Sequence, residues 1–163
     1  MSDRLTHLDE HGRARMVDVG AKSITERMCV ARADVRMAAA TIEKIAAGAF
    51  PKGDVLAVAR LAGIQAAKRT ADWIPLAHPI ALDALEIELR IDAAERCVHV
   101  QAVARAQART GVEMEALVGV TAASLALYDM CKAVDRGMTI EAVRLVEKQG
   151  GKSGRWVRPG ERE

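Results

Sequence analysis

Two side chains of opposite charge, Asp129 and Lys132, stand three residues apart in a segment with helical spacing. Residues three apart on a helix share a face, so the carboxylate and the amine can hold each other ionised and form an acid–base pair. The same spacing is common on solvated helix surfaces, where such a pair adds only about 0.2–0.5 kcal/mol. The spacing alone favours the surface pair and leaves the acid–base pair as the alternative.

Further candidates for chemistry lie in two other segments. Glu113 and Glu115 are two residues apart and point in different directions on a regular helix, and Glu113 also fits a capping box that starts at Thr110. His78 precedes Pro79 on a rigid loop, where an imidazole can contact an anion or donate a proton. A lone histidine is more often structural, so these residues do not identify a reaction by themselves.

Short motifs for phosphate and metal sites are incomplete. The segment Gly150-Gly-Lys-Ser153 lacks the earlier glycine of a phosphate loop, because Leu145 and Val146 occupy the required positions. His7 and His11 are four residues apart but do not form an H-E-x-x-H motif. The sequence therefore predicts no dedicated metal site.

The composition argues against several classes of protein. Lys and Arg number 24 against 22 Asp and Glu, a net charge of +2, which is not typical of a nucleic-acid binder. The three cysteines form no C-x-x-C pair, and free thiols suit a reducing cytosol. The polar N-terminus and the absence of an apolar run of about 18 residues predict a soluble, cytoplasmic protein without a membrane span.

Hydrophobic periodicity predicts the elements that position these residues. In a single domain over residues 1–163, the segments 1–15 and 155–163 are expected to be mobile tails. The predicted elements are a strand at 24–33, a helix at 36–47 stopped by Gly48, a helix capped by Asp54 and running to about residue 72, a hairpin of strands at 85–91 and 98–102, a long helix from about 110 to 134, and a strand at 140–147. This order predicts an α+β fold with helices on one face of a largely antiparallel sheet.

Several longer strings resemble the cyclic pyranopterin monophosphate synthase family. They include Lys52-Gly-Asp-Val55, Ala62-Gly-Ile-Gln-Ala-Ala-Lys-Arg-Thr70, Thr110-Gly-Val-Glu-Met-Glu-Ala-Leu117, Tyr128-Asp-Met-Cys-Lys-Ala-Val134 and Gly150-Gly-Lys-Ser-Gly154. The resemblance extends from about Leu5 to Gly154. It implies a ferredoxin-like fold and a homohexamer, built as a trimer of dimers, with active sites at subunit interfaces.

The resemblance also implies an activity. Members of the family are lyases of molybdenum cofactor biosynthesis that convert 3′,8-cyclo-7,8-dihydroguanosine 5′-triphosphate to cyclic pyranopterin monophosphate and pyrophosphate. They require no resident cofactor, although Mg²⁺ is a candidate companion of the triphosphate. The alternatives are a non-catalytic pterin- or nucleotide-binding oligomer on the same scaffold and an independent metal phosphohydrolase.

Carried onto this sequence, the resemblance implies that Asp129 is catalytic, with Lys52 and Lys132 completing an acid–base set. The substrate-binding positions that it implies are Leu76, Ala77, His78, Glu113, Met114, Glu115, Lys68 and Lys148. Among them, the cationic candidates for the triphosphate are His78, Lys68 and Lys148. The family usually carries Cys where Ala77 stands, so a thiol is not required at that position if the protein is active.

Overall fold

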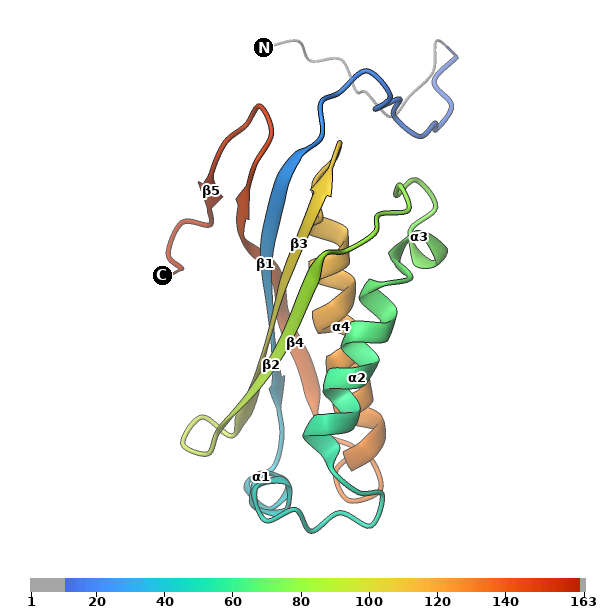
Figure 1. Cartoon of the computed structure of the whole chain (residues 1–163). Helices are drawn as coiled ribbons and strands as arrows, with labels where there is room; N and C mark the ends of the chain where they lie inside the picture. The colour runs from blue at the N-terminus through green and yellow to red at the C-terminus, as the bar shows by residue number, and fades with distance from the viewer. Residues whose placement is uncertain (1–10, 162–163) are drawn as a thin grey trace.

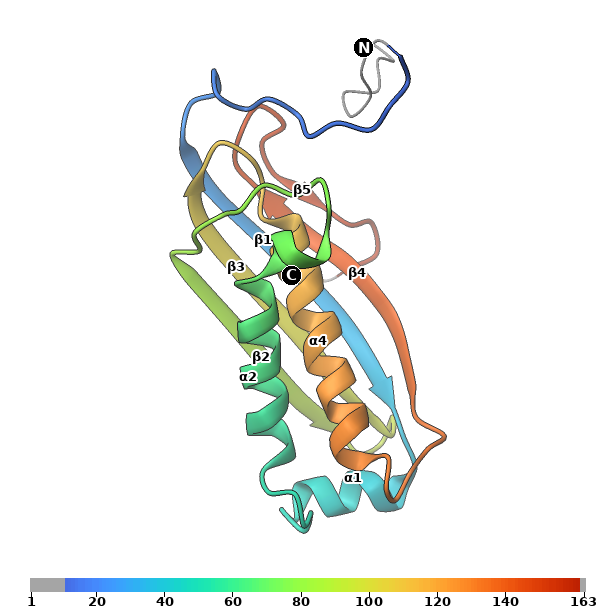
Figure 2. The same cartoon turned by 90° about the vertical axis from the view of Figure 1, so that its right-hand side faces the viewer.

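The computed structural model describes residues 11–161, which form an antiparallel sheet with helices on one face (Figures 1 and 2). The five strands lie in the order β2-β3-β1-β4-β5. The elements are β1 (Thr25–Arg36), α1 (Ala39–Ala46), α2 (Val55–Ala67), α3 (Thr70–Trp73), β2 (Ala84–Asp92), β3 (Cys97–Ala108), α4 (Glu113–Cys131), β4 (Thr139–Gln149) and β5 (Trp156–Val157). The predicted α+β fold is confirmed.

The central strands explain how the sheet has one apolar and one polar face. β1 and β3 pair along their whole lengths, with Val35 opposite Val98 and Asp34 opposite His99. Because side chains alternate along a strand, Val35 and Val98 are fully buried in the core under the helices, whereas Asp34 and His99 lie on the other face. Many core positions of these strands are alanine, such as Ala31, which lets α4 approach the sheet closely.

Helices α2 and α4 lie side by side over the sheet, as Figure 2 shows. Gly63 of α2 is buried at their contact. A Cβ atom at Gly63 would stand 2.9 Å from the Gly119 carbonyl oxygen and 3.2 Å from the Ala123 Cβ. The missing side chain therefore sets how closely the two helices pack.

Replacement of Gly63 by alanine is expected to destabilise the protein by about 1–2 kcal/mol in urea unfolding. Overpacking against a backbone oxygen costs about 1–3 kcal/mol, which outweighs the helix-propensity gain of about 1 kcal/mol. Leu61→Ala, at an exposed site on the same helix, is the control and should change stability by no more than about 0.5 kcal/mol. A Gly63→Ala protein as stable as wild type would mean that α2 can move away from α4 without cost.

Most predicted elements are present, although their ends differ. The hairpin is confirmed, and its two strands are longer than predicted. Asp54 caps α2 through a hydrogen bond from the Ala57 backbone N–H, as predicted. The helix predicted from residue 36 begins only at Ala39, because Arg36 is still paired in the sheet. The helix predicted to continue to residue 72 ends at Ala67, and α3 is a separate turn.

Two predictions about chain segments are wrong. Thr110 does not cap α4, because Val112 is the N-cap residue and no side chain makes a capping hydrogen bond there. The C-terminal segment is not a loose tail over its described part, since β5 pairs with β4 and Glu161 forms ion pairs with Arg32 and Arg144. The predicted mobility of residues 1–10, 162 and 163 lies outside the described residues.

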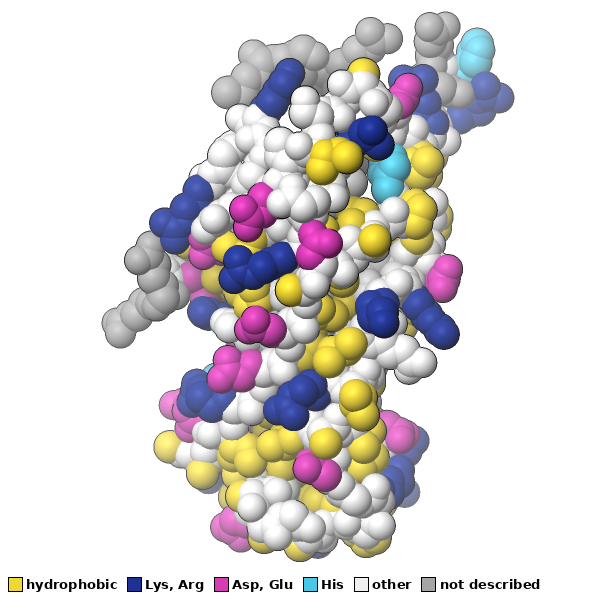
Figure 3. Space-filling view, in the orientation of Figure 1, with side chains coloured by type: hydrophobic (Ala, Val, Ile, Leu, Met, Phe, Trp, Pro, Cys, Tyr) yellow, Lys and Arg dark blue, Asp and Glu magenta, His cyan; other side chains and the backbone are white. Residues whose placement is uncertain are grey.

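The longest helix and the surface charges relate to two predictions: that the protein has no membrane span, and that it is not typical of a nucleic-acid binder. Within the described chain, α4 alone is long and apolar enough to cross a membrane, which the sequence analysis did not expect. Most of α4 is buried against the sheet and α2, as is usual for a core helix. On the face seen in Figure 3, acidic and basic side chains are interspersed, and hydrophobic ones gather toward the end where α1 lies.

Candidate active site

One group of predicted site residues lies at the C-terminal end of α4. The Lys132 Nζ is 2.6 Å from Asp129 Oδ1, and the Lys52 Nζ is 3.5 Å from Asp129 Oδ2 and 3.0 Å from its carbonyl oxygen. Lys52 comes from the loop before α2, so the fold joins segments 77 residues apart. The three residues proposed as the acid–base set are therefore neighbours, and all three are exposed.

The charges in this group stabilise one another's ionised forms. The hydrogen bond and charge of Lys132 lower the pKa of Asp129 below its ordinary value, and Lys52 acts in the same direction. The same hydrogen bond raises the pKa of Lys132. At neutral pH, Asp129 is thus a carboxylate that can accept a proton, and Lys132 is an ammonium that can donate one.

A second group lines a cavity of about 260 Å³ at the N-terminal end of α4. Its walls include all of the predicted substrate-binding stretch on the loop after α3 and all of the predicted stretch at the start of α4: Leu76, Ala77, His78, Glu113, Met114 and Glu115. His78 Nε2 donates to the Val17 carbonyl oxygen at 2.8 Å, so the neutral ring keeps Nδ1 as an acceptor. Lys68 lines an adjoining hollow that shares Glu115.

Glu115 is the buried carboxyl group of this cavity. Its residue is 3% exposed, and burial raises its pKa from 4.5 to about 7, helped by the nearby charge of Glu113. A carboxyl group with such a pKa exchanges a proton near neutral pH, which is the property of an efficient general acid or base.

Replacement of Glu115 by glutamine is expected to stabilise the protein at pH 8 by about 1–3 kcal/mol. A carboxyl group whose pKa is raised on folding stabilises fully below its unfolded value, and this contribution is lost as pH rises toward about 7. Glutamine cannot ionise, so the advantage of the variant should nearly vanish by pH 4.5. Urea unfolding at both pH values measures it, with exposed Glu43→Gln as the control. An equal advantage at both pH values would contradict the raised pKa.

A third hollow, of about 760 Å³, adjoins the second and is rich in cations. Lys148 borders it and forms an ion pair of 2.7 Å with Glu113, which explains why Glu113 does not complete the predicted capping box. The other basic residues on its walls are Lys22, Arg27, Arg109 and Lys152. Of these, Lys22, Arg27 and Arg109 were not among the predicted site residues, since an isolated basic residue carries no motif.

Glycines hold Arg27 at the edge of this hollow. The Arg27 guanidinium donates to the carbonyl oxygens of Ala108 and Arg109, at 3.3 and 3.4 Å. Gly150 and Gly151 both adopt positive φ, and a Cβ atom at Gly151 would collide with the Arg27 side chain. The Gly-Gly-Lys-Ser segment, which is not a phosphate loop, thus packs closely on the Arg27 guanidinium and, at Gly150, on the Glu26 carbonyl oxygen.

The two ends of α4 are too far apart to act together within one chain. Glu113 and Asp129 are sixteen residues apart on α4, which corresponds to about 24 Å at about 1.5 Å per residue. The Asp129 group and the cavity at His78 and Glu115 thus form two half-sites. A site that contains both groups needs a second copy of the chain.

Comparisons with known proteins identify the family of the chain. The model of the MoaC family matches residues 16–151. A cyclic pyranopterin monophosphate synthase of Roseiflexus sp. (strain RS-1) is 59% identical over 157 residues, covering 96% of this chain and 99% of that protein. The proteins of the same name from Roseiflexus castenholzii and Pelotomaculum thermopropionicum are 57% and 56% identical, each over 96% of this chain and over 99% and 92% of their own lengths. With the family model matching most of the chain and relatives this similar over nearly its full length, the chain belongs to the MoaC family.

Proposed function

We propose that this protein is a lyase of molybdenum cofactor biosynthesis. It converts 3′,8-cyclo-7,8-dihydroguanosine 5′-triphosphate to cyclic pyranopterin monophosphate and releases pyrophosphate. The names and high identity of the relatives support this activity. The observation within the chain that carries it is the contact of Asp129 with both Lys52 and Lys132, because the rearrangement needs proton transfers.

The cationic hollow suits the triphosphate of this substrate. Negative charge increases on the leaving pyrophosphate, and fixed cations aimed at that charge stabilise the transition state. Arg27, Lys148 and Lys152 border the hollow, and the buried carboxyl group of Glu115 lies in the cavity beside it. The triphosphate then lies over the cations while the purine and ribose reach toward His78 and Glu115. Mg²⁺ accompanies the triphosphate as part of the substrate complex.

Two kinds of acid–base group serve the rearrangement. Asp129 and Lys132 hold each other ionised, which supplies a carboxylate and an ammonium in fixed positions but makes each a weaker base or acid until the substrate separates them. Glu115 has a pKa of about 7 and suits uptake and release of a proton at neutral pH. Both kinds of group act on one substrate only if two subunits meet.

The same proposal includes the assembly and its setting. Active sites form where the Asp129 end of one subunit meets the Glu115 end of another, in a homohexamer built as a trimer of dimers. The subunit fold is of the ferredoxin-like type, and the enzyme works in the cytoplasm on a small-molecule substrate. The oligomer requirement rests on the distance along α4 between the two half-sites.

Turnover of the cyclic triphosphate by the purified protein tests the proposed function. The expected result is an oxidisable pterin product, detected by fluorescence, together with one pyrophosphate for each substrate consumed. Substrate binding without turnover would identify a non-catalytic binding oligomer instead. A metal phosphohydrolase would instead consume the substrate through a tightly held ion. Its substrate consumption would stop after exhaustive chelation and would not recover when only Mg²⁺ and substrate are added back.

A further inference from the structure

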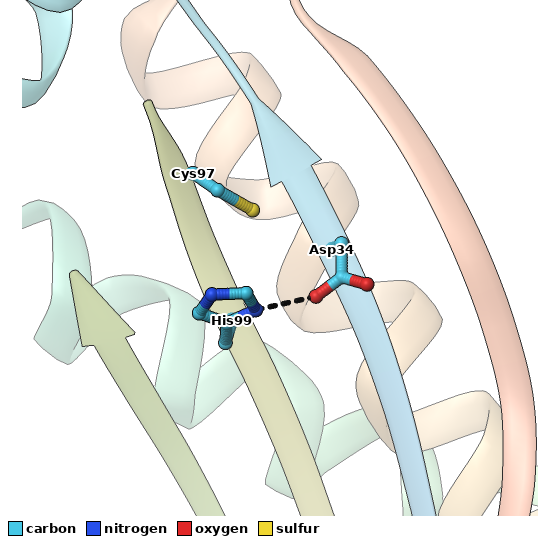
Figure 4. Close-up of side chains that lie close together, drawn as sticks. All are labelled: Asp34, Cys97 and His99. Carbon is cyan, nitrogen blue, oxygen red and sulfur yellow. Dashed lines mark hydrogen bonds and ion pairs between the residues drawn. The ribbon is translucent and has the colours of Figure 1, made fainter. Parts of the chain in front are cut away.

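Three side chains with metal-binding atoms lie together on the sheet face opposite the helices. Asp34 of β1 is directly opposite His99 of β3, and Cys97 is two residues before His99 and therefore on the same face. The carboxylate oxygen, ring nitrogen and sulfur lie within 4.8 Å of one another. Figure 4 shows the three side chains turned toward one another across the β1–β3 pairing.

A hollow of about 330 Å³ leads to this cluster from solvent. Asp34 and His99 lie on its wall, and Cys97 is fully buried beside them. The hollow shares no lining residue with the cavities at the N-terminal end of α4. It is thus a separate feature of the molecule, with a route by which an ion and water can reach the carboxylate and the imidazole.

The arginines near the hollow repel a cation less strongly than their number suggests, because each is paired with a carboxylate. Arg36 is paired with Glu141 and Glu95, and Arg90 with Asp92. Arg32 and Arg144 both pair with Glu161. Among residues 11–161, Asp34 contacts one guanidinium group, that of Arg144 at 3.4 Å. The wall of the hollow itself carries three arginines and two carboxylates, Asp34 and Glu88, so a cation site there depends on the pairing of those arginines with Asp92 and Glu161.

His99 has carboxylates on both sides of its ring. Its Nδ1 donates to Asp34 Oδ1 at 2.6 Å, and its Nε2 is 3.9 Å from Asp92 Oδ2. If the proton moves from Nδ1 to Nε2, Nδ1 becomes free to bind a metal. Asp92 can then accept a hydrogen bond from the new Nε2–H group. Metal-binding histidines usually have such a carboxylate partner on the second nitrogen.

We propose that Asp34, Cys97 and His99 bind a divalent cation of the zinc class, with the fourth coordination position open to the hollow. A thiolate, an imidazole and a carboxylate together favour Zn²⁺ over Mg²⁺ or Ca²⁺, and three protein ligands with one open position are a common zinc arrangement. Ligand atoms of a tetrahedral zinc ion lie about 3.3–3.7 Å apart, given bond lengths of about 2.0–2.3 Å. Binding therefore opens the Asp34–His99 contact, now 2.6 Å, by about 1 Å and brings the Cys97 sulfur to a similar distance from both ligand atoms.

Binding also changes the protonation of the cluster. Cysteine binds a zinc-class ion as the thiolate, not as the thiol. A bound metal ion deprotonates a coordinating thiol. Binding should thus release about one proton for each ion and weaken as pH falls.

Titration of the chelator-treated full-length protein with Co²⁺ and Zn²⁺ tests the site. We expect one Co²⁺ per chain with a sulfur-to-cobalt charge-transfer band and tetrahedral d–d bands, displacement by Zn²⁺, and about one proton released by calorimetry in two buffers. Cys97→Ser should abolish the charge-transfer band, and Cys97→Ser and His99→Gln should each weaken Zn²⁺ binding by more than about 100-fold. Asp92→Asn should weaken it by about 10–100-fold.

The matched control is Cys29→Ser, which removes another buried thiol far along the same sheet and should keep the band. Far-ultraviolet circular dichroism confirms that each variant is folded, and Asp92→Asn supplies a milder test where a ligand variant unfolds. No band with Co²⁺ and no heat with Zn²⁺ would overturn the proposal. So would a band or an affinity unchanged in folded Cys97→Ser and His99→Gln, because the ion would then be bound elsewhere.

Discussion

Replacement of Asp129 by asparagine is expected to lower turnover of the cyclic triphosphate by about 10²–10⁴-fold while the fold and the assembly stay intact. Asparagine has the same size but cannot take up a proton, and it carries no charge to pair with Lys132 and Lys52 as the carboxylate does. Asp129 is exposed and its side chain accepts only from these lysines among the contacts of the described residues, so its loss removes little packing. Steady-state and single-turnover rates measure the effect, and the circular dichroism spectrum reports the fold.

The control for this substitution is Glu43→Gln, which removes an exposed carboxylate from α1 and should keep the wild-type rate. A wild-type rate in Asp129→Asn would remove Asp129 from the chemistry. A loss of activity that is accompanied by unfolding or by dissociation of subunits would mean that the carboxylate has a structural role instead.

The sequence predicts the sheet well where one face of a strand is buried. In β2 the alternation of apolar and charged residues around Ile87 and Leu89 has a period of two, and both residues are buried as the pattern requires. The same logic finds β3. Gly48 and Asp54 predict the end of one helix and the start of the next, because a left-handed backbone and a side-chain cap are local properties.

Features that depend on distant partners were not predictable from local patterns. Arg36 reads as part of a helix until its pairing with Cys97 extends the strand. Glu113 fits a capping box until Lys148, 35 residues later, takes its carboxylate. The C-terminal segment looks loose because its order comes from pairing with β4 and from ion pairs with Glu161. Tertiary contacts decide each of these cases.

In the candidate site, too, some features follow from local sequence patterns and others only from contacts between distant residues. The contact of Asp129 with Lys132 follows from helical spacing alone, but the approach of Lys52 to the same carboxylate needs the whole fold. Arg27 acquires its place from hydrogen bonds to the carbonyl oxygens of Ala108 and Arg109, which the β1–β3 pairing brings beside it. The distance between Asp129 and Glu115 along α4 could be derived from the sequence once both were assigned to one helix, and it has the largest consequence.

Mixed oligomers of two inactive variants are expected to regain about a quarter of the wild-type activity. Asp129 and Glu115 lie near opposite ends of α4, so each shared site takes one of them from each of two subunits. When Asp129→Asn and Glu115→Gln subunits are dissociated, mixed in equal amounts and reassembled, about a quarter of the sites combine an intact Asp129 with an intact Glu115. Turnover per subunit, before and after mixing, measures the recovery.

A second mixture separates shared sites from sites within one chain. Subunits that carry both substitutions are mixed with an equal amount of wild type. If sites are shared, about a quarter of them again stay intact in this second mixture. If each site lies within one chain, about half stay intact in the second mixture, and the first mixture shows no recovery. No recovery of activity in the first mixture, together with half of the wild-type activity in the second, would refute the shared site. Because the two residues are about 21 Å apart at about 1.5 Å per residue, it would also require the substrate to be handled at one end of α4 only.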